Sequence, residues 1–243
     1  MPKILIVNPN TTAEMTRKVE ATARAVAAPD TTVTATNPVD GPVSIEGFVD
    51  EAYAVPGLLD VLRQNQEFDG YVIACFDDTG LDAARCVVQA PVIGIGEAAF
   101  HYATFLTGKF SVVTTLSRSI AAIDHNLVRY GLSSRCASVR ASDVPVLELE
   151  NPESGAYEKI RAEAMRARDD DHCGAIVLGC AGMTDLVARL SADIGLPVLD
   201  GVSCSIKIAE GLASLNLQTS RIGSYAPPRA KPYLGRLADS SIG

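Results

Sequence analysis

The sequence predicts an α/β fold with two pseudo-symmetric lobes, each containing a mostly parallel sheet flanked by helices, and a site in the cleft between them. Three observations predict this fold. Short runs rich in β-branched residues alternate with longer helix-like stretches, several short runs are apolar without alternation, and segments of the first half recur in the second. Continuous apolar runs are typical of parallel strands that are buried on both faces.

Eight short runs are expected to form strands, four in each half of the chain. Those of the first half are residues 3–8, 32–36, 70–75 and 91–95, and those of the second are 109–114, 137–140, 174–179 and 197–199. Helix-like stretches lie between them, for example residues 13–27, 52–65 and 157–169. This alternation is typical of a parallel sheet whose strands are joined by crossover helices.

Three pairs of segments recur 105 or 106 residues apart. Lys3 to Asn8 matches Lys109 to Thr114, Val72 to Cys75 matches Val177 to Cys180, and Pro91 to Ile93 matches Pro197 to Leu199. The common spacing predicts two homologous lobes rather than a chance likeness in composition. We place the first α/β lobe at residues 1–107 and the second at 108–218, with a C-terminal segment of about 219–243 crossing back to the first.

Composition limits the class of partner. The 243 residues include 21 Lys and Arg against 29 Asp and Glu, a formal net charge of −8, and 47% of them are hydrophobic. An acidic balance without basic clusters disfavours nucleic acid and anionic membranes, because both need Lys or Arg to neutralise phosphate. No apolar run approaches the roughly 20 residues that span a bilayer, and no signal sequence is recognised. We expect a cytoplasmic protein with a small-molecule substrate.

The positions of two of the six cysteines point to a site. No Cys-x-x-Cys pair occurs and the three histidines lack metal-ligand spacing, so no metal site is expected. Cys75 and Cys180 are equivalent in the repeat, and each follows a predicted parallel strand at its carboxyl end, where open α/β sheets bind ligands. We expect these two thiols to face each other across one site. The sequence leaves open whether Cys204 also reaches it.

Two opposed thiols suit the inversion of a carbon whose acidic hydrogen lies beside a carbonyl. One thiolate removes a proton from one face, and the other thiol donates a proton to the opposite face. A turn into a helix is expected after each cysteine, with Asp78 or Thr79 and Thr184 as N-caps, and a helix N-terminus lowers a nearby thiol pKa. Asp77 and Asp78 would raise it, so at least one is expected to cap a helix and point away. Alternatively, both cysteines are core residues.

Six segments spread along the chain form a recognisable pattern: Asn8 to Thr12, Gly41 to Gly47, Ala74 to Gly80, Val112 to Thr115, Leu178 to Met183 and Tyr225 to Tyr233. Together they resemble the hydantoin racemase family of the aspartate/glutamate racemase superfamily, which includes allantoin racemases. The resemblance covers nearly the whole chain. It implies a two-lobed fold, proton transfer at one carbon without a cofactor, Cys75 and Cys180 as the acid/base pair, and a homo-oligomer.

The residues that follow each of the two cysteines differ from those of amino acid racemases in that superfamily, and both differences favour a flat, neutral cyclic ureide as substrate. Relatives that act on free amino acids typically carry Cys-Asn-Thr and Cys-Thr-Glu, whereas here the cysteines are followed by Phe76-Asp77 and Ala181-Gly182. Arylmalonate decarboxylases keep one of the two cysteines, so the presence of both favours a racemase. Removing the C5 hydrogen of a hydantoin gives an enolate that needs hydrogen-bond donors.

The resemblance and the strand-end positions give a set of residues expected to contact the substrate. Asn10 and Thr11 are expected to hold ring amide groups. The hydroxyls of Thr114 and Thr115, with backbone N–H groups after the two cysteines, are expected to bind the enolate; as an alternative, these residues only cap helices. The whole set is Asn10, Thr11, Ile45, Phe76, Thr79, Thr114, Thr115, Ala181 and Gly182.

The leading hypothesis is a racemase that inverts C5 of 5-substituted hydantoins. The nearest alternative is the same chemistry on allantoin, itself a 5-ureidohydantoin. A non-catalytic two-lobed ligand binder and a thiol redox sensor are the alternatives from other classes. Gly94-Ile-Gly96 resembles part of a dinucleotide fingerprint but follows the fourth expected strand rather than the first, so no nucleotide cofactor is expected.

Overall fold

The computed structural model describes residues 1–151, 153–235 and 238. Within these residues, eight strands form two parallel four-stranded sheets with the orders β2-β1-β3-β4 and β6-β5-β7-β8. The predicted α/β class with two lobes and parallel sheets is therefore confirmed. The strands are β1 (Lys3–Val7), β2 (Thr32–Thr36), β3 (Gly70–Ile73), β4 (Val92–Gly94), β5 (Phe110–Thr114), β6 (Cys136–Ala141), β7 (Ile176–Gly179) and β8 (Val198–Asp200).

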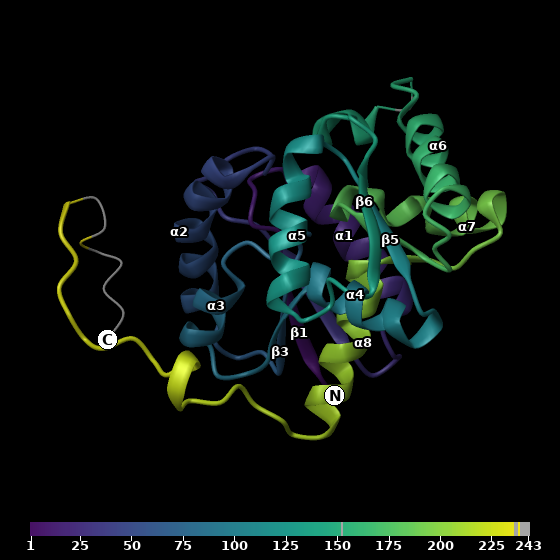
Figure 1. The fold of residues 1–243 in the computed structure, drawn as a ribbon. Helices are drawn as coiled ribbons and strands as arrows, with labels where there is room; N and C mark the ends of the chain where they lie inside the picture. Colours follow the sequence, from purple (N-terminus) through teal and green to yellow (C-terminus); the bar gives the residue numbers. More distant parts are fainter. Residues whose placement is uncertain (152, 236–237, 239–243) are drawn as a thin grey trace.

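Helices connect the strands and cover both sheets (Figure 1). The α-helices are α1 (Ala13–Val26), α2 (Phe48–Gln64), α3 (Leu81–Val87), α4 (Ile95–Leu106), α5 (Ile120–Arg129), α6 (Ala156–Asp169), α7 (Val187–Ile194) and α8 (Gly201–Ser214). Four 3₁₀ helices complete the described elements: η1 (Ser117–Ser119), η2 (Val146–Glu150), η3 (Ala181–Leu186) and η4 (Gly223–Tyr225).

The helix α2 begins at Phe48, four residues before the start expected from the sequence. The polar residues Asp50 and Glu51 belong to its first turn rather than to the preceding loop. Carboxylates are favourable there, because the helix N-terminus carries a partial positive charge. The other two expected helices, α1 and α6, lie within a residue of their predicted bounds.

The second sheet repeats the order of the first, with every strand number raised by four. In both sheets the first strand of the lobe lies between the second and the third. The register pairs Val7 with Ile73 in one sheet and Thr114 with Gly179 in the other. The central strands therefore end side by side in each lobe; Cys180 follows directly after the end of β7, and Cys75 lies two residues after the end of β3.

The last helix of each lobe packs against the other lobe. The helix α4 contacts β7 and β8 of the second sheet, α8 contacts β3 and β4 of the first, and the two helices contact each other. Figure 1 shows α4 and α8 in the middle of the molecule, with α2 and α3 on one side and α6 and α7 on the other. One buried core cluster consequently joins Ile4 and Val72 of the first sheet to Val112 and Val177 of the second.

The helix α8 lies on strands of the first sheet, and the expected return of the segment from about residue 219 to the first lobe stays a prediction. Beyond α8, the backbone N–H of Thr219 donates to the carbonyl of Gln89 (3.0 Å). The Arg221 guanidinium donates to the carbonyls of Arg85, Cys86 and Val88 at the end of α3, where a cation is favourable. The division of the chain at residues 107 and 108 stays a prediction. Along the described residues, no helix is both long and apolar enough to cross a bilayer.

A substitution at the start of α8 tests how strictly this arrangement requires close helix contact. A Cβ at Gly201 would lie 2.2 Å from the carbonyl oxygen of Ile95. We expect Gly201→Ala to lower the free energy of unfolding by about 1–3 kcal/mol, because backbone rather than a flexible side chain must move. Gly211→Ala in the same helix meets nothing within 4 Å, so we expect a gain of about 0.5–1 kcal/mol. Urea unfolding followed by circular dichroism measures both, and equal stability of the two variants would contradict the prediction.

Candidate active site

A narrow cavity lies at the carboxyl ends of the two sheets and takes residues from both lobes. Its volume is about 30 Å³, roughly one water's share of liquid volume. Ile45 lines it from the loop before α2 and Val146 from the start of η2, and the two segments are joined where the Val146 N–H donates to Glu46 Oε1 (3.2 Å). The lining residues are Asn10, Met15, Ile45, Ala74, Cys75, Phe76, Asp77, Thr115, Ser119, Val146, Gly179, Cys180 and Ala181.

The cavity brings the two repeat-equivalent thiols together. Cys75 follows β3 and Cys180 follows β7, and both line the same space. All six cysteines of the chain lie in the described residues and none is in a disulfide. Cys204 is buried in the core cluster around α8 and does not line the cavity. Both thiols therefore belong to one cavity, and the hypothesis that they face each other across a substrate stays a prediction.

The surroundings of Cys75 both favour and oppose its thiolate. The Thr79 hydroxyl donates to Cys75 Sγ (3.2 Å), and the backbone N–H of Asp77 also bonds it. Burial, followed by the charge of the Asp77 carboxylate, raises the pKa of the Cys75 thiol well above its usual value. The expected lowering of this pKa by a helix start is therefore wrong.

Burial is the main cause, and no helix begins at the expected N-caps to offset it. After Cys75 the chain makes a turn, and α3 starts only after Gly80, which adopts a left-handed conformation (φ 72°) without a side-chain cap. Thr79 is occupied with the thiol instead. After Cys180 comes the 3₁₀ helix η3, within which Thr184 lies and accepts a bond from the Thr22 hydroxyl (2.9 Å).

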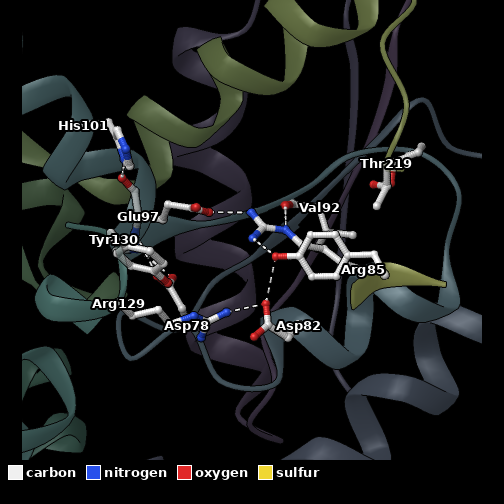
Figure 2. Close-up of polar contacts among 12 residues, drawn as sticks. Asp78, Asp82, Arg85, Val92, Glu97, His101, Arg129, Tyr130 and Thr219 are labelled. Carbon is white, nitrogen blue, oxygen red and sulfur yellow. Dashed lines mark hydrogen bonds and ion pairs between the residues drawn. The ribbon is translucent and has the colours of Figure 1, made fainter. Parts of the chain in front are cut away.

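Asp78 does cap a helix and point away from the thiol, but the helix is α4. Its carboxylate accepts bonds from the backbone N–H groups of Gly96 (2.9 Å) and Glu97 (2.8 Å) and from the Tyr130 hydroxyl (2.6 Å) (Figure 2). A Cβ at Gly94 would lie 2.2 Å from Asp78 Oδ1. The Gly-x-Gly pattern that resembles a dinucleotide fingerprint thus makes room for an internal carboxylate.

Asp77 is the only Asp, Glu, Lys, Arg or His among the residues that line the cavity. Burial raises the pKa of its carboxyl to about 7, and the nearby Glu51 adds to the effect. Burial also raises the pKa of Glu51. Asp77 is not among the site residues expected from the sequence, although its place two residues after Cys75 is a usable signal. No sequence signal indicated Met15, Ser119 and Val146, because they come from helices and loops that lie far from Cys75 along the chain.

Five of the nine expected substrate contacts line the cavity: Asn10, Ile45, Phe76, Thr115 and Ala181. The Asn10 side chain is held by its oxygen, which accepts bonds from Asn8 Nδ2 and from the Thr12 N–H (both 2.9 Å). Its amide nitrogen faces only the sulfur of Met15 (3.7 Å), a weak acceptor. That nitrogen is consequently a donor available to a ligand.

The other four expected contacts, Thr11, Thr79, Thr114 and Gly182, do not line the cavity. The Thr11 hydroxyl donates to the Pro42 carbonyl (3.3 Å), and the Thr114 hydroxyl donates to the Gly179 carbonyl (3.0 Å). The Gly182 carbonyl accepts from Lys18 Nζ (3.2 Å). These residues shape the walls of the cavity through their neighbours; Thr114, for instance, ties β5 to the end of β7. No cluster of three or more potential His, Cys, Asp or Glu metal ligands occurs among the described residues.

Replacement of Asp77 by Asn tests the electrostatics around Cys75. The carboxylate is ionised above pH 7 and raises the thiol pKa, so its loss should move thiolate formation to lower pH. The pH dependence of Cys75 alkylation by iodoacetamide, resolved by peptide mass spectrometry, measures this. Asp30→Asn removes the same charge from the surface and should leave the profile unchanged. An unaltered profile in Asp77→Asn would show that burial alone raises the pKa.

Known racemases resemble this chain in fold and in sequence. An allantoin racemase from Klebsiella pneumoniae has the same fold with a TM-score of 0.95 and 46% identity, over 99% of each chain. An allantoin racemase from Pseudomonas fluorescens gives 0.93 and 41%, over 96% of this chain and all of that one. A hydantoin racemase from Rhizobium meliloti is 47% identical over 96% of this chain and 97% of its own.

A family model described as Asp/Glu/Hydantoin racemase matches residues 4–209, which include both lobes and both candidate thiols. By this match and by the identity to the relatives above, the chain belongs to the Asp/Glu/hydantoin racemase family.

Proposed function

We propose that this protein is a racemase that inverts C5 of 5-substituted hydantoins by proton transfer between Cys75 and Cys180. One observation carries the proposal: two thiols at equivalent positions of the repeat, one from each lobe, line a single cavity. Family membership and the similarity to hydantoin and allantoin racemases support it. We also propose that the protein acts in the cytoplasm as a homo-oligomer.

The reaction balances with the two thiols alone. A thiolate takes the C5 proton, the C–H electron pair moves into the adjacent carbonyl as an enolate, and the thiolate becomes a thiol. The thiol on the opposite face then gives its proton to C5, the carbonyl re-forms, and that sulfur is left as the thiolate. No electrons leave the system, and exchange of S–H protons with water resets the pair.

Donors around the cavity fit the charge that develops on the ring. The amide nitrogen of Asn10 and the hydroxyl of Thr115 lie on the wall and are assigned to ring oxygens. Thr79 and the Asp77 N–H stabilise the thiolate form of Cys75. Met15, Ile45, Phe76 and Val146 supply apolar surface suited to a flat neutral ring.

The function is tested with one enantiomer of 5-benzylhydantoin in D₂O at neutral pH, with optical rotation and C5 deuteration followed together. Loss of rotation with deuterium incorporation, above an enzyme-free control, is the expected result. Turnover of allantoin but not of 5-benzylhydantoin would move the substrate to allantoin. Inactivity on both, with binding retained, would favour the ligand-binder alternative.

The two-thiol mechanism predicts equal roles for the cysteines. Cys75→Ser and Cys180→Ser should each lower racemisation of either enantiomer by about 100- to 10,000-fold, because each loses one general acid/base. Deuterium exchange without inversion should survive for the enantiomer served by the remaining thiol. Cys136→Ser, outside the cavity, is the control and should retain activity. Wild-type rates in both cavity variants would refute the mechanism.

The Asp77 carboxyl specifically favours allantoin as a second candidate substrate. It is a charged hydrogen-bond acceptor on the cavity wall, and the ureido group of allantoin offers N–H donors that a benzyl group lacks. We expect Asp77→Asn to lower kcat/KM for allantoin about 10-fold more than for 5-benzylhydantoin, the effect of losing one charged hydrogen bond. A change in thiol pKa affects both substrates and therefore cancels in the ratio of their kcat/KM values. An unchanged ratio would argue against this contact.

A further inference from the structure

The turn that carries Cys75 is anchored to α4 through Asp78. The backbone N–H of Asp78 donates to the carbonyl of Cys75 (3.0 Å), so the thiol and this carboxylate belong to one tight turn. Asp78 has a φ of 51°, a left-handed conformation that non-glycine residues seldom adopt. Such a conformation persists where surrounding contacts determine it, and here the three hydrogen bonds to the Asp78 carboxylate do so.

Several elements surround the Asp78 carboxylate. A Cβ at Gly96 would lie 2.4 Å from the Phe76 carbonyl oxygen and 3.0 Å from Asp78 Oδ2, so glycines at 94 and 96 leave the room that this turn and its carboxylate need. The Tyr130 ring lies against Phe100 of the core, which fixes the hydroxyl that donates to Asp78. Beside this carboxylate, the Arg85 guanidinium donates to the Glu97 carboxylate (2.5 Å), and Figure 2 shows this pair next to Tyr130 and Asp78.

The second lobe lacks this connection. The position equivalent to Asp78, three residues after Cys180, is the buried Met183. The helix α8 is capped by its own Asp200, whose Oδ1 accepts from the Ser203 N–H (2.7 Å). Gly94 stands where Asp200 would be in the first lobe. The cap of α4 is thus supplied by the cysteine turn, whereas the cap of α8 is independent of Cys180.

We propose that Asp78 is a positioning residue for Cys75: its carboxylate, held by the N-terminus of α4 and by Tyr130, fixes the turn that presents the thiol to the cavity. The inference rests on the proposed two-thiol function. It assigns the first lobe a support for its thiol that the second lobe does not have, so its loss should affect one face of the substrate only.

Asp78→Asn and Tyr130→Phe test the proposal. The amide places an NH₂ group against one of three donors, and Tyr130→Phe removes one of the three bonds while keeping the ring. We expect Asp78→Asn to lower inversion about 10- to 100-fold, the effect of a misplaced catalytic group, and Tyr130→Phe to act less in the same direction. For the enantiomer deprotonated by Cys180, return of deuterium to the same face should increase relative to inversion; for the other it should not.

Asp200→Asn is the matched control, because it makes the same amide-for-carboxylate change at the equivalent helix cap without touching a cysteine turn. It should lower the melting temperature but leave the ratio of exchange to inversion unchanged for both enantiomers. Equal, direction-independent losses in Asp78→Asn, Tyr130→Phe and Asp200→Asn would overturn the proposal in favour of a purely structural role. Should Asp78→Asn not fold, the ratio in Tyr130→Phe decides.

A second readout does not depend on turnover. Alkylation of Cys75 by iodoacetamide, relative to Cys180 in the same sample, should be faster in Asp78→Asn and Tyr130→Phe and unchanged in Asp200→Asn. If the wild-type protein racemises neither substrate, the proposed function fails, but this ratio still reports whether Asp78 holds the turn. An unchanged ratio in both Asp78→Asn and Tyr130→Phe would overturn the positioning role.

Discussion

Where α4 and α8 begin, their backbones touch: a side chain at Gly201 would meet the carbonyl of Ile95. These two residues are 106 positions apart, so they are equivalent in the repeat and the lobes meet at like positions. From this contact each helix runs over the sheet of the other lobe, and one core forms from both. The carboxyl ends of β3 and β7 are thereby fixed relative to each other. A cavity lined by a thiol from each lobe follows from that constraint.

The same packing decides how the acidic groups beside Cys75 act. Two adjacent carboxyls follow a buried thiol, and all three have a raised pKa because burial disfavours charge. The charge on Asp78 is stabilised at the start of α4, away from the sulfur. Asp77 remains on the cavity wall, where it opposes the thiolate. In the proposed function, a substrate that hydrogen-bonds to Asp77 would weaken that opposition, and this would couple binding to activation of the thiol.

The strands, their parallel direction and the cavity around both cysteines could be predicted, because they depend on apolar runs and on a repeat that the sequence displays directly. Side-chain partners could not. Thr79 and Asp78 are residue types common at N-caps, yet Thr79 bonds the thiol and Asp78 caps a helix that begins seventeen residues further on. Ser119 and Val146 enter the cavity from elements whose placement depends on the packed lobes. Local patterns identify which residues can hydrogen-bond, and only tertiary packing selects the partner.

Racemisation in two directions does not require that both thiols be held by the same contacts. Two enantiomers of a hydantoin have equal free energies in solution, so kcat/KM for racemisation must be the same in both directions whatever the surroundings of each thiol. Asymmetry can therefore enter only through kcat and KM separately, and through the partition between exchange and inversion. The lobes differ in this respect: the Cys75 turn is bonded to α4, whereas η3 after Cys180 contacts α1 through Lys18 and Thr22. Divergence after duplication could thus alter the scaffold of each thiol without disturbing the balance of the reaction.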